Sequence, residues 1–208
     1  MKYVLTALVI LLCWPLSAQA RPVSYPGGWT FITNNDKDSN AALVHYTLNP
    51  KLALGARHEY LRGSQTHVDA LQLNWLVKRW NGPDSQANLY IKSGLGTGYK
   101  DGDIEPAAFT GLAIDWEDRR YFASYENKFF KAGNLASFAK HSARVGIAPY
   151  IGQPGDIHTW LMLQADYSPA KQDDFSLTPL VRFFKGSNLL EAGYNLDNSL
   201  LFNYTHRF

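Results

Sequence analysis

The sequence predicts an all-β protein, a transmembrane antiparallel up-and-down β-barrel of about twelve strands. Apolar and polar residues alternate with period two in one segment after another between Gly27 and Phe208. Aromatic residues make up 14% of the chain, and no apolar run after residue 20 is long enough for a membrane-spanning helix. An apolar, aromatic-rich outer face with a polar inner face is typical of transmembrane barrels.

Each predicted strand is a segment of alternating polarity that ends at turn-forming residues such as Gly, Pro, Asn and Asp. Most segments have about the 9–11 residues that a tilted membrane strand needs. Ten strands are the nearest alternative, because the first segment is short and the connection at Leu196–Asn198 is tight. In order, the segments are Trp29–Asn34, Asn40–Leu48, Lys51–Leu61, His67–Trp80, Ala87–Tyr99, Ala107–Trp116, Arg119–Lys131, His141–Ile151, His158–Tyr167, Phe175–Lys185, Asn188–Asn195 and Ser199–Phe208.

The alternation assigns one face of each segment to the outside of the barrel. In Phe175–Lys185, for example, the side chains of Leu177 and Val181 oppose those of Thr178 and Arg182. Aromatic residues on the outward faces fall near both ends of the segments, as amphipathic rings at a lipid–water interface do. These are Tyr60, Tyr99, Phe129, Tyr167, Phe175 and Tyr194 at one end, and Trp80, Trp116, Tyr121, Phe183 and Phe208 at the other.

The last segment places Leu200, Phe202, Tyr204, His206 and Phe208 on one face and ends on the aromatic Phe208. This pattern resembles the C-terminal β-signal of Gram-negative outer-membrane β-barrels. The resemblance implies an outer-membrane location, contact with outer-membrane lipid, and reading of Tyr204 and Phe208 by the barrel-insertion machinery. His206 departs from the bulky residue that this family usually has at that position.

Residues Met1–Ala20 contain Lys2, an uncharged apolar run from Tyr3 to Trp14, and a small-x-small site at Ala18–Ala20. This is the pattern of a secretory signal peptide, so we expect cleavage after Ala20 and a single barrel domain over residues 21–208. Cys13 is the only cysteine of the chain, and Leu11-Leu12 before it does not fit a lipoprotein site. The mature chain is therefore expected to lack disulfides and thiolate chemistry.

The connections between segments form two alternating sets. In barrels of the outer-membrane family the periplasmic turns are short and the external loops are longer, so the tighter set is expected on the periplasmic side. The tight set is Asn49-Pro50, Asn81–Asp84, Glu117-Asp118, Gly152–Gly155 and Gly186-Ser187. The longer set is Asn35–Ser39, Arg62–Thr66, Lys100–Pro106, Ala132–Lys140, Ser168–Asp174 and Leu196–Asn198.

The inward faces are expected to carry eight basic and five acidic residues. Such charges either brace a closed interior in pairs or line a water-filled pore, and the basic excess would favour anionic solutes. Arg57, His58, Glu59, Tyr60 and Arg62 also resemble the arginine-rich strands of twelve-stranded oligogalacturonate and sialate porins. The expected lumen-lining residues are Arg57, Glu59, Lys78, Lys92, Asp115, Arg120, Glu126, Lys128, Arg144, Asp166, Arg182, Glu191 and Arg207.

The function expected first is therefore a narrow pore or passive channel for small, anionic solutes. A closed structural or partner-binding envelope barrel is the alternative, and a lipid-modifying enzyme comes third. The enzyme would need a nucleophile and a base on the outer face, where His58 and Ser93 lie on segments that are not neighbours. The histidines have no metal-ligand spacing, and no charge run indicates nucleic-acid binding, so no catalytic residue, metal or cofactor is expected.

Overall fold

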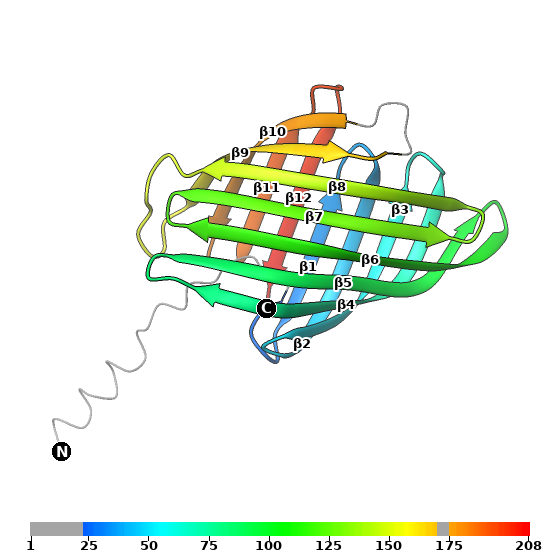
Figure 1. Cartoon of the computed structure of the whole chain (residues 1–208), viewed down its shortest axis with the longest axis horizontal. Helices are drawn as coiled ribbons and strands as arrows, with labels where there is room; N and C mark the ends of the chain where they lie inside the picture. Colours follow the sequence, from blue (N-terminus) through cyan, green and yellow to red (C-terminus); the bar gives the residue numbers. More distant parts are fainter. Residues whose placement is uncertain (1–22, 170–174) are drawn as a thin grey trace, which may run out of the picture.

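The computed structural model describes residues 23–169 and 175–208, which form one closed antiparallel barrel (Figure 1). Each strand pairs with its neighbours along the chain, and β1 pairs with β12, so the prediction of twelve strands is confirmed. The strands are β1 (Trp29–Asn35), β2 (Ser39–Asn49), β3 (Leu52–Leu61), β4 (Thr66–Asn81), β5 (Ser85–Lys100), β6 (Asp103–Asp118), β7 (Tyr121–Ala132), β8 (Ala136–Ile147), β9 (His158–Tyr167), β10 (Phe175–Lys185), β11 (Asn188–Tyr194) and β12 (Leu200–Arg207).

The first and last strands close the barrel. Thr33 lies opposite Tyr204 in the β1–β12 ladder, and the Phe208 amide donates to the Trp29 carbonyl at 3.0 Å. We call the end of the barrel that holds Trp29 and Phe208 the terminal end, and the other end the distal end. In Figure 1 strands β4–β8 cross in front of β1–β3 and β10–β12, as expected where tilted strands wrap around a barrel. Within the described residues, no helix has the length and apolarity to cross a membrane.

The outer surface of the barrel is apolar. Leu71 and Leu95 are 63% and 73% exposed there, whereas their inward neighbours Ala70 and Gln72 are buried. The predicted outward aromatics also point away from the interior, and all but the half-buried Tyr60 are exposed. An apolar surface of this extent is unusual for a protein surrounded by water and suits contact with lipid.

Strand lengths differ around the wall, so the lengths of several connections differ from those predicted. The expected loop at Lys100–Pro106 is only the turn Asp101-Gly102, where positive φ values of 52° and 95° make a tight hairpin. The expected loop at Ala132–Lys140 shortens to Gly133–Leu135, because β8 already begins at Ala136. In contrast, the connection over residues 148–157 at the terminal end, expected to be tight, is long. Pro149 and Pro154 lack the N–H donors that a longer ladder would need.

A β-bulge in β4 changes the side-chain parity near the terminal end. The register of β4 against β5 shifts between Leu76 and Lys78, so that Lys78 pairs with Leu89 and Arg79 pairs with Asn88. The extra residue rotates the following side chains by one position. Lys78 therefore faces outward and lies over the Trp80 ring at 5.1 Å, while Arg79 faces inward. The prediction that Lys78 lines the lumen is wrong for this reason.

Candidate functional site

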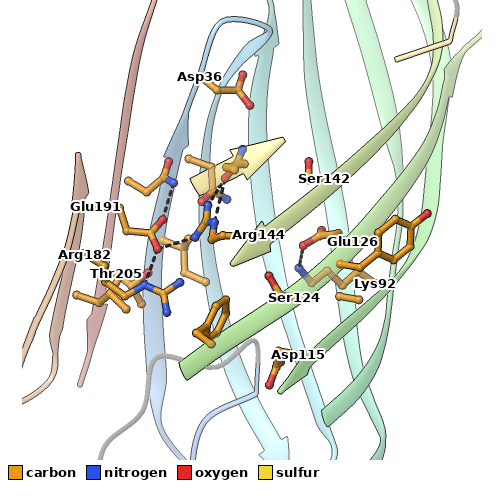
Figure 2. Close-up of a pocket in the computed structure, with 18 of the residues that line it drawn as sticks. Asp36, Lys92, Asp115, Ser124, Glu126, Ser142, Arg144, Arg182, Glu191 and Thr205 are labelled. Atoms are coloured by element: carbon orange, nitrogen blue, oxygen red, sulfur yellow. Dashed lines mark hydrogen bonds and ion pairs between the residues drawn. The ribbon is translucent and has the colours of Figure 1, made fainter. Parts of the chain in front are cut away.

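A continuous cavity of about 1770 Å³ runs through the interior of the barrel. Its lining includes Asp36 and Arg62 at the distal end, and Gly82 and Asp156 in connections at the terminal end. Between the ends it is lined by charged side chains from several strands, as Figure 2 shows. Eight-stranded barrels are filled by side chains, and here the twelve-stranded wall leaves space inside.

One charged cluster lies on the wall formed by β8, β10, β11 and β12. Glu191 accepts hydrogen bonds from Arg144 Nη1 at 2.7 Å, Arg182 Nε at 2.7 Å and Asn203 Nδ2 at 2.9 Å. Arg144 also donates to the Gln164 side chain, and the Arg182 guanidinium lies 4.6 Å from the centre of the Phe122 ring. The carboxylate is thus held between two guanidinium groups, and we call this set the Glu191 network.

A second cluster, the Glu59 network, lies on the wall that includes β3 and β7. Glu59 accepts hydrogen bonds from Arg57 Nε at 3.0 Å and from Lys128 Nζ at 2.6 Å. The Lys128 ammonium also lies 5.0–5.6 Å from the ring centres of Phe109, Phe130 and Phe138. The carboxylate and the three ring faces both stabilise the ammonium group in this position.

The charged interior also holds an ion pair and a lysine that lies beside three carboxylates. Lys92 Nζ is 2.6 Å from Glu126 Oε2, on a part of the wall away from the Glu191 network (Figure 2). At the distal end, Lys140 Nζ lies 2.7 Å from Asp36, 3.1 Å from Asp38 and 4.0 Å from Asp166. Because these pairs join strands that are far apart in the sequence, they brace the wall while leaving the central space open.

The charges are not balanced along the cavity. Each of the two networks holds two cations for one carboxylate, whereas Lys92 and Glu126 compensate each other. The central part of the lining, which we call the waist, thus carries five basic and three acidic side chains. These are Arg57, Lys92, Lys128, Arg144 and Arg182 with Glu59, Glu126 and Glu191.

Nine of the thirteen residues expected to line the lumen do line the cavity: these eight and Asp115. Asp166 and Arg207 face inward but are covered, with 6% and 9% exposure. Arg120 lies exposed in the turn between β6 and β7, because β7 begins only at Tyr121, and its neighbour Arg119 lines the cavity instead. Lys78 faces outward, as described above.

Several charged residues that line the cavity ends were missed from the sequence. Most lie in or beside turns, where alternation with period two no longer assigns a face, and Lys140 lies on the part of β8 that was expected to be a loop. The signal in the sequence that could have indicated them is the clustering of charged residues, mainly acidic ones, near the connections. At the terminal end they are Asp84, Glu117, Asp118, Arg119 and Asp156, and at the distal end Asp36, Lys37, Asp38, Arg62 and Lys140.

The two side chains of the catalytic alternative, His58 and Ser93, lie on the outer face with different partners. His58 Nδ1 is 2.7 Å from Asp69 Oδ1, whereas the Ser93 hydroxyl pairs with Thr110 at 2.9 Å. The structure therefore places the candidate base and nucleophile in separate polar pairs. Within residues 23–169 and 175–208, no group of three or more His, Cys, Asp or Glu side chains is placed to hold a metal ion.

The expected insertion signal lies at the closing strand. Phe208 is 66% exposed at the terminal end, and its outward neighbour His206 packs edge-on against it with ring centres 4.6 Å apart. The Tyr204 hydroxyl donates to Asn188 Oδ1 at 2.7 Å on the adjacent strand. The expected signal peptide, residues 1–20, lies outside the described residues.

No protein-family model and no curated protein sequence matches the chain. Among solved structures, it resembles a KdgM porin in complex with disordered oligogalacturonate, with 7% identity, a TM-score of 0.51, and coverage of 87% of this chain and 98% of that one. OccAB4 of Acinetobacter baumannii gives 11% identity, a TM-score of 0.43, and coverage of 86% and 57%. At such low identity the comparison concerns architecture alone: the chain shares the fold of the KdgM porin.

Proposed function

We propose that this protein is a passive channel of the outer membrane of a Gram-negative bacterium, which admits small polar solutes and prefers anionic ones. The observation that carries this proposal is the cavity of about 1770 Å³, whose lining includes residues from connections at both ends of the barrel. A closed structural barrel would instead fill its interior with packed side chains.

The anion preference follows from the waist. Its five cations exceed its three carboxylates, and charges that line a pore set the local concentration of oppositely charged solutes. Asp115 and carboxylates at both ends, such as Asp36 and Asp156, oppose this excess. The full lining holds nine basic and ten acidic side chains, so we expect a modest preference that depends on the waist. The solved KdgM porin was captured with oligogalacturonate, and a small acidic saccharide is a solute of the kind that the waist cations would attract.

The outer-membrane location is supported by the apolar outer surface, the aromatic residues near both ends and the shared porin fold. Outer-membrane lipid would then surround the barrel, and Tyr204 and Phe208 would present the insertion signal. Cleavage after Ala20 would leave Arg21 as the first residue of the mature chain. Mass analysis of the protein extracted from the outer membrane tests both the location and the cleavage. A protein that still carries residues 1–20 would contradict the cleavage, and a soluble periplasmic protein would contradict the location.

The experiment that tests the channel is reconstitution of the purified barrel in a planar bilayer. The wild type should give discrete conductance steps, and a salt gradient should give a reversal potential of the sign for anion preference. The double substitution Arg144→Gln with Arg182→Gln removes two waist cations and should move this potential toward cation preference. Lys78→Gln is the matched control, because Lys78 faces outward and its loss should leave the reversal potential unchanged.

The outcomes separate the two leading functions. A silent wild type, with a folded barrel shown by heat-modifiable migration on gels, would contradict the channel and favour a closed structural or partner-binding barrel. If the double variant conducts with the wild-type reversal potential, the channel function stands, but the waist does not determine its ion preference.

A further inference from the structure

Residues 23–28, directly before β1, fold back into the barrel. We call residues Val23–Gly28 the strap. The strap precedes the first residue of β1, Trp29, and lies against the inner face of the wall at the terminal end. Val23 is 3% exposed and packs with Ala53, Leu76, Tyr90 and Ala113 in one buried cluster. These four partners face inward from four successive strands, β3, β4, β5 and β6. Val23 thus fills an apolar part of the inner wall of the barrel.

Main-chain hydrogen bonds fix the strap to β2. The Gly27 amide donates to the Thr47 carbonyl at 2.9 Å, and the Thr47 amide donates to the Gly28 carbonyl at 3.0 Å. The Ser24 amide also contacts the Thr47 hydroxyl at 3.4 Å. Gly27 has φ +84°, a conformation that side chains disfavour, and this turns the chain inward. The Tyr25 hydroxyl donates to the Phe208 carbonyl, which joins the strap to the closing strand.

The inner wall around the strap is closed to solvent. Thr30, His45, Thr47, Ala53 and Tyr90 are all 0% exposed, whereas the side chains of Lys92 and Glu126 in the waist keep 21% and 45% exposure. At the terminal end the cavity is instead lined by the connections near Gly82, Asp118 and Asp156, on other parts of the wall. The strap side of this end is packed, and the open path lies elsewhere.

From this arrangement we infer that the strap, with Val23 as its anchor, sets the width of the pore at the terminal end and so limits the size of the solutes that pass. This inference rests on the proposed channel function. Without the strap, the opening at the terminal end would be wider. The space that Val23 fills would then be bounded only by the wall residues that it now covers. A segment inside a lumen limits passage by occupying the space itself, independently of the charges at the waist.

The position of the strap can be tested without any measurement of transport. Cys13 is the only cysteine of the chain and lies in the expected signal peptide, so introduced cysteines would be the only thiols after cleavage. Val23→Cys combined with Ala113→Cys, and in a second variant with Ala53→Cys, should give an internal disulfide on mild oxidation. Mass analysis of the folded protein shows the bond. Pro26→Cys with Ala113→Cys is the control, because Pro26 is exposed and outside the cluster.

The effect on the pore is tested by Val23→Asp, which places a charge in the apolar cluster and should release the strap. We expect a single-channel conductance at least roughly 1.5-fold above that of the wild type, and faster uptake of larger uncharged solutes in swelling assays. Pro26→Asp adds the same charge to the same segment at an exposed position and should leave the conductance unchanged.

Each outcome bears on one of the two claims. A disulfide in neither pair, or an unchanged conductance in a folded Val23→Asp barrel that is otherwise conducting, would overturn the role of the strap. A barrel that forms the disulfide but never conducts, as wild type or as Val23→Asp, would instead overturn the channel function. That result would also remove the pore whose width the strap is proposed to set.

Discussion

Arg144 Nη1 lies 2.7 Å from Glu191 Oε1, although β8 and β11 are separated in the wall by β9 and β10. The contact is made because the wall curves and both side chains point to its concave side. With Arg182 on β10, Arg144 holds a carboxylate that is only 5% exposed. The Glu191 network is therefore part of the cavity lining and also a brace across strands β8–β11.

Removal of this carboxylate should destabilise the barrel. In Glu191→Gln the two guanidinium groups lose their shared anion, and loss of one partner from a buried ion pair costs about 3–5 kcal/mol. The free energy of unfolding, measured by urea titration with tryptophan fluorescence, should fall by roughly 3 kcal/mol. Glu126→Gln is the matched control, because Glu126 is 45% exposed and binds one cation, and it should cost less than about 1 kcal/mol. Equal losses for both variants would contradict the brace.

The ammonium group of Lys128 should contribute to anion preference in the channel. Lys128→Met keeps the apolar contacts with Phe109 and Phe130 but removes one of the two cations beside Glu59. The Glu59 network then becomes neutral, and the reversal potential in a salt gradient should move toward zero. Lys128→Arg, which retains the charge, should keep the wild-type value. A Lys128→Met channel with unchanged selectivity would show that this network does not face the permeating ions.

The aromatic ring of Phe208 should matter for assembly beyond its contact area. Phe208→Ala keeps the main-chain hydrogen bond to Trp29 but removes an exposed ring at the terminal end. If the ring is part of an insertion signal and an interfacial anchor, the yield of folded, heat-modifiable barrel in the outer membrane should fall severalfold. Phe202→Ala, on the outer face of β12, is the control and should have a smaller effect. Similar yields for the two variants would argue against the signal.

Gly111 occupies a position where the wall has no room for a side chain. A Cβ atom there would lie 1.9 Å from the Asn127 carbonyl oxygen, next to an irregularity where the Leu112 amide donates to Asn127 Oδ1. Gly111→Ala should therefore lower the free energy of unfolding by about 1–3 kcal/mol in the urea titration. Gly63→Ala, where nothing lies within 4 Å of the added carbon, should leave it unchanged. A Gly111→Ala barrel as stable as the wild type would mean that the ladder relaxes at this point.

The strand count and most inward and outward faces follow from the sequence because alternation with period two depends only on neighbouring residues. For this reason Arg182 and Glu191 were placed inside correctly. The same reasoning fails where alternation is interrupted. The bulge after Leu76 turns Lys78 outward, and Arg120 lies in a turn rather than on an inward strand face, so both predictions are wrong. Alternation does not reveal a single extra residue in one strand.

Other features depend on the closed shape and could not be read from the chain. Whether Lys128 reaches Glu59 depends on the diameter and tilt of the wall, because the two residues are 69 positions apart. The strap was missed for a related reason. Val23 precedes the first alternating segment, and only the assembled inner faces of β3–β6 provide the apolar surface that it covers.

The bulge in β4 also has a consequence for protein engineering. Because Val77 is the extra residue between Leu76 and Lys78, its deletion would restore regular pairing, with Lys78 still opposite Leu89 and Arg79 still opposite Asn88. Lys78 and Trp80 would keep their outward faces, and Arg79 would keep its inward contact with Asn88. Val77 is thus a residue that β4 can lose without an exchange of its inward and lipid-facing side chains, so the charges on both sides of the wall would stay where they are.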